Sequence, residues 1–177
     1  MAKWSIDSDH SVAAFSIRHM MVSNVRGQFN KISGEISFDP SDISHATVEV
    51  IIDASGIYTG IQKRDDHLRS QDFFDVSRYP SIVFKSGAVE VIGDKRLKIS
   101  GDLAIHGVTR LVTLEAEYSG PEKSPFGDTS LGFTAATRIN REDYGLLWNV
   151  DLESGGVMVG KEVDIFIEIE ADLKSSD

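Results

Sequence analysis

The chain has 177 residues, a formal charge of −10 at pH 7 and no cysteine. This length fits one domain, residues 1–177, and 41% hydrophobic residues supply material for its core. The lack of cysteine excludes disulfides, thiolate metal sites and cysteine nucleophiles. Because acidic residues outnumber basic ones 28 to 18, the chain repels nucleic-acid phosphates, and we expect no nucleic-acid partner.

The N-terminal segment predicts the compartment. Asp7 and Asp9 stand where a signal peptide would need an apolar stretch. No apolar run approaches the roughly 20 residues needed to span a bilayer. The sequence therefore predicts a soluble, cytoplasmic protein without a transmembrane segment.

A change of register is expected early in the chain. Within residues 25–38 the apolar positions change parity, from the odd-numbered Phe29 to the even-numbered Ile32. A strand that buries one face keeps one parity, so a bulge or bend near Asn30 and Lys31 would reconcile the two halves.

One helix interrupts the strands. Thr59 precedes Gln62 by three residues, which is the spacing of a capping box, and Ile61 and Leu68 lie at helical intervals. We place a helix at about 60–70, with Thr59 as its cap.

The remaining chain alternates with period two, the pattern of strands with one buried and one solvated face. The last strand is the clearest, because apolar side chains fill every second position from Val163 to Leu173. Only Phe166 interrupts its polar face. With similar runs at 48–52 and from residue 97 onward, the count reaches about eight strands.

Many long alternating strands with one helix require a two-sheet sandwich or a closed barrel. Runs of about nine to twelve residues exceed the usual strand length, which favours the barrel. An eight-stranded barrel is wide enough to be filled by side chains or to hold one slender ligand.

Three motifs in order resemble the YceI-like family. The first runs from Asp7 to Phe29, the second from Arg64 to Ser86 and the third from Gly101 to Thr109, so the resemblance covers essentially the whole chain. It implies an all-β fold, an eight-stranded antiparallel lipocalin-like β-barrel with one short helix. It also implies an apolar tunnel for a polyisoprenoid or isoprenoid quinone, and no catalytic chemistry. Many members of the family are periplasmic.

Alternation identifies candidate side chains for the tunnel wall, since the apolar face of a barrel should point inward. Met20 is added because a flexible thioether adapts to a flexible ligand. The candidates are Phe15, Ile17, Met20, Phe29, Val50, Phe84, Ile99, Leu103, Leu114, Phe133 and Ile165.

The block from Arg64 to Asp75 has two interpretations. In the structural one, its arginines pair with local acids and its two phenylalanines plug one barrel end. In the functional one, the helix is a lid over the tunnel and an arginine meets a lipid head group. The second adds three candidate ligand-binding residues, namely Arg64, Leu68 and Phe73.

Other motifs carry little chemistry. The stretch Gly155–Lys161 is similar to a phosphate-binding loop, but Glu162 replaces the required Ser or Thr and a strand follows, so a Gly-rich turn is expected. Histidines and acids could suggest a metal site, but they lack dedicated ligand spacing, and we expect neither metal nor cofactor. These residues are Asp9, His10, Asp65, Asp66 and His67.

The sequence thus favours non-catalytic binding, storage or transport of a long-chain isoprenoid lipid. Two alternatives remain open. One is an enzyme that acts on a bound lipid or quinone near Asp65 and His67. The other is an acidic interaction module with a filled core and a basic partner. A homodimer is also left open.

Overall fold

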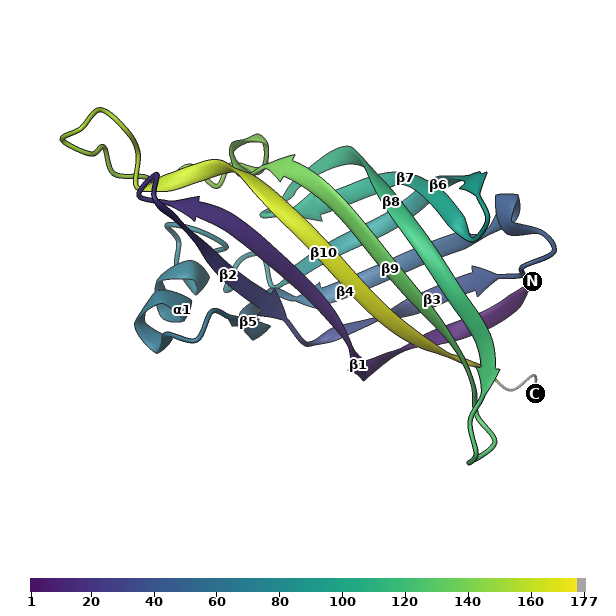
Figure 1. Ribbon diagram of the computed structural model, residues 1–177. Coiled ribbons are helices and arrows are strands. Elements are labelled where there is room, and N and C mark those ends of the chain that lie inside the picture. The colour runs from purple at the N-terminus through teal and green to yellow at the C-terminus, as the bar shows by residue number, and fades with distance from the viewer. Residues whose placement is uncertain (175–177) are drawn as a thin grey trace.

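The computed structural model describes residues 1–174, which form a closed antiparallel β-barrel (Figure 1). The sheet order is β10-β9-β8-β7-β6-β4-β3-β1-β2-β5, and a further pairing of β10 with β1 closes the ring. The predicted eight-stranded antiparallel barrel with one helix is confirmed. Its wall strands are β1 (Ala2–His19), β3 (Ile32–Phe38), β4 (Thr47–Asp53), β6 (Ser81–Gly93), β7 (Arg96–Ile105), β8 (Val108–Lys123), β9 (Thr129–Asn140) and β10 (Val159–Leu173).

Strand β1 changes partner along its length. Its first part pairs with β3, and its second part pairs with β2 (Ser23–Phe29). The short β5 (Ile57–Tyr58) is added outside β2. Only Asn30 and Lys31 separate β2 from β3, so the predicted bend is confirmed at the place where the apolar parity changes.

The helix α1 (Gln62–Arg69) lies within the predicted range. Three 3-10 turns accompany it: η1 (Ile43–His45), η2 (Ala54–Gly56) and η3 (Arg141–Tyr144). The predicted cap is wrong, because Ile61 occupies the N-cap and makes no side-chain hydrogen bond. Thr59 instead donates its N–H and its hydroxyl to the buried carboxylate of Asp65. Burying a carboxylate is costly unless hydrogen-bond donors contact it. Thr59 supplies two such donors to Asp65 and therefore does not cap the helix.

Alternation along the strands separates the inside of the barrel from the outside. On β10, Ile169 and Ala171 are buried, whereas Phe166 points outward and is 54% exposed. The turn between β7 and β8 consists of His106 and Gly107, both with positive φ, which suits a tight hairpin.

One end of the barrel is packed with side chains, and we call it the closed end (Trp4, Phe38, Leu97, Tyr118 and Leu131). The Phe38 and Tyr118 rings lie 4.9 Å apart in edge-to-face contact. The Trp4 indole N–H donates to the Phe38 carbonyl at 3.1 Å. The chain termini lie at this end, opposite α1 (Figure 1). None of the helices within residues 1–174 is long and apolar enough to cross a membrane.

Gly34 on β3 is the position least tolerant of a side chain. Its φ is +150°, and a Cβ there would lie 2.0 Å from the Glu49 carbonyl oxygen. We expect Gly34→Ala to lower stability by about 1–3 kcal/mol and the melting temperature by roughly 2–12 °C. Thermal unfolding followed by circular dichroism measures this change.

Gly87 on β6 is the matched control, because its φ is ordinary and the nearest atom to a Cβ is 3.8 Å away. Gly87→Ala should therefore melt within a degree or two of wild type. Equal melting temperatures for the two variants would contradict the strain assigned to Gly34.

Candidate ligand-binding cavity

Beyond the closed end the barrel is hollow. The cavity has a volume of about 340 Å³ and is lined by side chains from all eight wall strands. This volume lies at the lower end of the range for small-molecule sites. Ile36, Ala116, Phe133 and Ile169 line its deepest part, and the Phe133 ring contacts Phe38 of the closed end at 5.4 Å. The cavity therefore stops at a packed layer of protein.

The structure brings most of the predicted ligand-binding side chains to this cavity. Thirteen of the fourteen lie on its wall. They are Phe15, Ile17, Phe29, Val50, Arg64, Leu68, Phe73, Phe84, Ile99, Leu103, Leu114, Phe133 and Ile165. Their contact with a ligand stays a prediction.

Met20 is not on the wall. It lies in the turn between β1 and β2, with φ of 50° and 44% of its surface exposed. Met20 is a candidate because of its flexible side chain and not because of strand alternation, and flexibility does not indicate on which side of the wall a residue lies.

Sequence reasoning missed two kinds of wall residue. Small side chains such as Ala14 and Ala135 carry little apolar signal, although they leave the space that makes the cavity. Leu146 and Trp148 come from the loop 145–158, which has no periodicity to read. Trp148 contacts the His67 ring at 4.8 Å between centroids, a pairing that only the tertiary fold creates.

Residues 62–79, the lid segment, cover the end of the cavity opposite the closed end. Figure 1 shows α1 beside β2 and β5 at this end. Phe73 and Phe74 line the cavity, and Phe74 packs edge-on against Phe29 at 5.7 Å. Arg69 holds α1 in place by donating to the carbonyls of Ser55 and Ile57 at 2.8 and 2.9 Å.

The acidic and imidazole groups proposed for an enzyme do not form a pair. The Asp65 carboxylate is buried and accepts from Thr59, and it does not line the cavity. The His67 imidazole does line the cavity, but its Nε2 is 2.8 Å from Asp72 Oδ2. Asp65 and His67, the two residues of the enzyme alternative, therefore contact different partners and not each other. The cavity also contradicts the alternative of a filled core.

Two arginines at the lid end have polar partners but lie on the apolar wall. Arg64 donates from Nε to Thr59 Oγ1 at 2.7 Å and from Nη2 to the Thr59 carbonyl at 2.8 Å. Arg141 of η3 is 3% exposed and donates to the carbonyls of Gly160, Val159 and Leu146. Burial lowers the pKa of Arg141 from its usual value, against a smaller opposite effect of Glu142.

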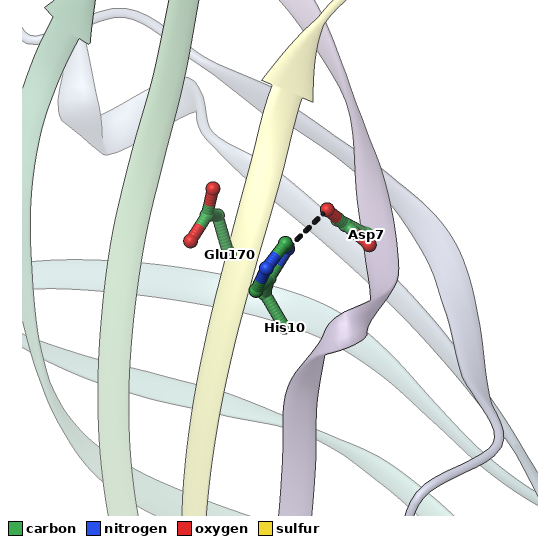
Figure 2. Close-up of side chains that lie close together, drawn as sticks. All are labelled: Asp7, His10 and Glu170. Atoms are coloured by element: carbon green, nitrogen blue, oxygen red, sulfur yellow. Dashed lines mark hydrogen bonds and ion pairs between the residues drawn. The ribbon is translucent and has the colours of Figure 1, made fainter. Parts of the chain in front are cut away.

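The metal-binding candidates from the sequence do not assemble. Within residues 1–174, the group with ligand atoms inside 4.8 Å of one another is Asp7, His10 and Glu170. Figure 2 shows it beside the irregular part of β1, with Glu170 on β10. His10 Nδ1 lies 2.7 Å from Asp7 Oδ2, an exposed contact that serves as a hydrogen bond between neighbours in sequence.

A closed wall of eight strands around one apolar space places the chain among the lipocalin-like β-barrels. Residues 4–171 match the model of the YceI-like domain, and the chain belongs to this family. The suspected family is thereby confirmed.

Relatives match over most of the chain. A UPF0312 protein of Staphylococcus aureus is 37% identical over 164 residues, which are 92% of this chain and 93% of the relative. A UPF0312 protein of Vibrio cholerae is 36% identical over 137 residues, 77% of this chain and 72% of the relative.

Solved structures share the fold. The Campylobacter jejuni YceI protein superposes with a TM-score of 0.74 at 31% identity, covering 89% of this chain and 90% of that one. A polyisoprenoid binding domain from Saccharophagus degradans gives 0.72 at 18% identity, covering 98% of this chain and 100% of that domain. At the latter identity the likeness shows the fold alone.

The Asp7–His10 pair makes a testable prediction about pH. The hydrogen bond to Asp7 raises the pKa of His10 above 6.5, and the same bond lowers the pKa of Asp7. We expect NMR titration to give a His10 pKa above 6.5, and Asp7→Asn to return it toward that value. Because the folded pKa is raised, any stabilisation is complete below the unfolded pKa of 6.5 with Asp7 ionised. It is lost as pH rises through the folded value.

His45 serves as the internal control. Its hydrogen bond to Asp42 also raises its pKa above the ordinary value, and Asp7→Asn does not touch this pair. A His10 titration that is the same with and without the Asp7 carboxylate would contradict the assignment.

Proposed function

We propose that the protein binds a long-chain isoprenoid lipid in its cavity and carries or stores it without changing it chemically. The observation that carries this proposal is an apolar cavity of about 340 Å³ that is closed at one end and covered by the lid segment at the other. Membership of the YceI-like family supports it. The structure from Saccharophagus degradans, described as a polyisoprenoid binding domain, agrees with it.

The energetics of burial favour such a ligand. Each buried methylene-sized group contributes about 0.8 kcal/mol, so a five-carbon isoprene unit contributes roughly 4 kcal/mol. Association costs roughly 4–15 kcal/mol in lost freedom and ordering. A few isoprene units therefore offset the cost, and the selectivity rests on slender shape and apolar surface.

The separate partners of Asp65 and His67 support carriage over turnover, because these two groups do not act on one another. Asp65 is committed to Thr59, and His67 contacts Asp72, Phe73 and Trp148. Both interactions have clear structural roles, since one orders the start of α1 and the other holds the lid segment against the loop 145–158.

Mass spectrometry of an organic-solvent extract tests the proposal directly. Purified protein should release a long-chain lipid in about a one-to-one ratio to the chain. Repeated absence of lipid after expression in several hosts, together with no uptake of added isoprenoids, would overturn the proposal.

The variant Leu103→Asp tests whether the cavity wall contacts the lipid. Leu103 on β7 lines the cavity, and a carboxylate there would meet the apolar tail without a partner. Such burial costs several kcal/mol, so lipid loading should fall by roughly 100-fold or more. Loading is measured by the same extraction.

Leu111→Asp is the matched control, because Leu111 on β8 is 75% exposed and does not line the cavity. The Leu111→Asp protein should bind as much lipid per chain as the wild-type protein. Full loading of a Leu103→Asp protein with a native circular dichroism spectrum would place the ligand elsewhere.

A further inference from the structure

The ionisable side chains on the cavity wall are all basic. They are Arg18, His19, Arg64, His67 and Arg141. Among residues 1–174, no Asp or Glu lines the cavity, although the whole chain carries 28 acidic and 18 basic residues. The charge of the wall is thus opposite to the charge of the protein.

These basic side chains share the lid end of the cavity. Arg18 and His19 are the last residues of β1, and His19 pairs with Val159 on β10. Arg141 donates to the carbonyls of Val159 and Gly160, and a Cβ on Gly160 would lie 3.1 Å from the Arg18 Cβ. Arg64 and His67 are on α1, within the lid segment.

The three arginines lack a counterion within the described part of the chain. Arg18 donates to the Met21 carbonyl, Arg64 to Thr59, and Arg141 to three carbonyls, and none of them forms an ion pair there. His67, by contrast, contacts the Asp72 carboxylate. Carbonyl oxygens satisfy N–H groups but do not neutralise a cation.

Among the three arginines, Arg141 is the one whose charge is the most costly to bury. Arg141 is 3% exposed and forms no ion pair within residues 1–174, so its guanidinium carries a desolvation cost that an anion at this place would offset. Charge-assisted hydrogen bonds from guanidinium to phosphate or carboxylate are also stronger than those to a neutral oxygen.

We infer that the carried lipid has an acidic head group, a phosphate or a carboxylate, held at the lid end by Arg18, Arg64 and Arg141. This inference rests on the proposed function. The apolar tail then extends toward the closed end, where the wall offers only hydrocarbon and ring surfaces. A neutral prenyl alcohol or quinone would occupy the same tail site, but it would lack the charge-assisted hydrogen bonds between the arginines and an acidic head group.

A pair of ligands with identical tails tests the inference. Geranylgeranyl monophosphate and geranylgeraniol differ only at the head, and Trp148 on the wall supplies a fluorescence signal for titration. We expect the phosphate to bind roughly 10- to 100-fold more tightly at low salt, since hydrogen bonds to charged groups contribute more than neutral ones. Added sodium chloride should reduce the difference. Inorganic phosphate should bind far more weakly than the prenyl phosphate.

Arginine variants locate the head group. Arg64→Met should weaken binding of the phosphate more than binding of the alcohol, and so reduce the preference for phosphate at least several-fold. Arg64→Lys should restore part of it, because the charge remains. Arg18→Met should act in the same direction. Arg26→Met is the control, since Arg26 lies exposed on β2 away from the cavity, and it should leave both affinities as in wild type.

The outcomes separate the inference from the proposed function. Equal affinity for the alcohol and the phosphate, or an undiminished preference in both methionine variants, would overturn the acidic head group and leave isoprenoid carriage standing. Inorganic phosphate binding as tightly as the prenyl phosphate would also overturn it, because the tail would then contribute nothing. Binding of neither prenyl ligand would overturn both.

Discussion

The pairing of β1 with β10 is the interaction on which the rest of the structure depends. It runs from the Trp4–Leu173 pair to the His19–Val159 pair and joins the first strand to the last. A sheet closed in this way has no free wall edge, and eight strands fix an interior just wide enough for side chains or one ligand. To span this length β1 must exchange β3 for β2, and the break at residues 30–31 allows the exchange.

The same wall encloses two different interiors because side-chain size changes along the barrel axis. At the closed end, Phe38 meets Tyr118 and Phe133 across the lumen, and the rings interlock. Toward the lid segment, positions such as Ala14, Val50 and Ala135 are too small to meet across it. The small side chains at these inward-facing positions leave the space of the cavity, and residues of α1 and the loop 145–158 line its other end.

Much of this architecture could be predicted from the sequence, because the choice between inside and outside repeats every second residue. The alternation on β10, including the outward Phe166, follows this rule, as does the parity change beside Asn30. The level of a residue along the axis could not be predicted, since it depends on the register between distant strands. Leu97 and Leu103 share one strand face, yet the first is in the closed end and the second lines the cavity.

Contacts between distant segments explain the other failures. Thr59 has the spacing of a helix cap, but the burial of Asp65 gives it a different partner. The basic character of the cavity was only partly visible, because Arg141 and Arg18 stand in unremarkable sequence and become wall residues through the 3-10 turn and the end of β1. Local sequence patterns do not show which distant residues the fold brings together on the cavity wall.

The layer formed by Trp4, Phe38 and their neighbours makes the binding site a blind tube. Under the proposed function, a lipid enters this cavity with its tail leading and leaves by the same route. With its head group at the inferred site, the distance from the arginines to the aromatic layer limits the length of chain that the barrel holds. Chains shorter than this distance leave unfilled volume, and every unit beyond it must stay outside the barrel, in contact with the lid segment or with water.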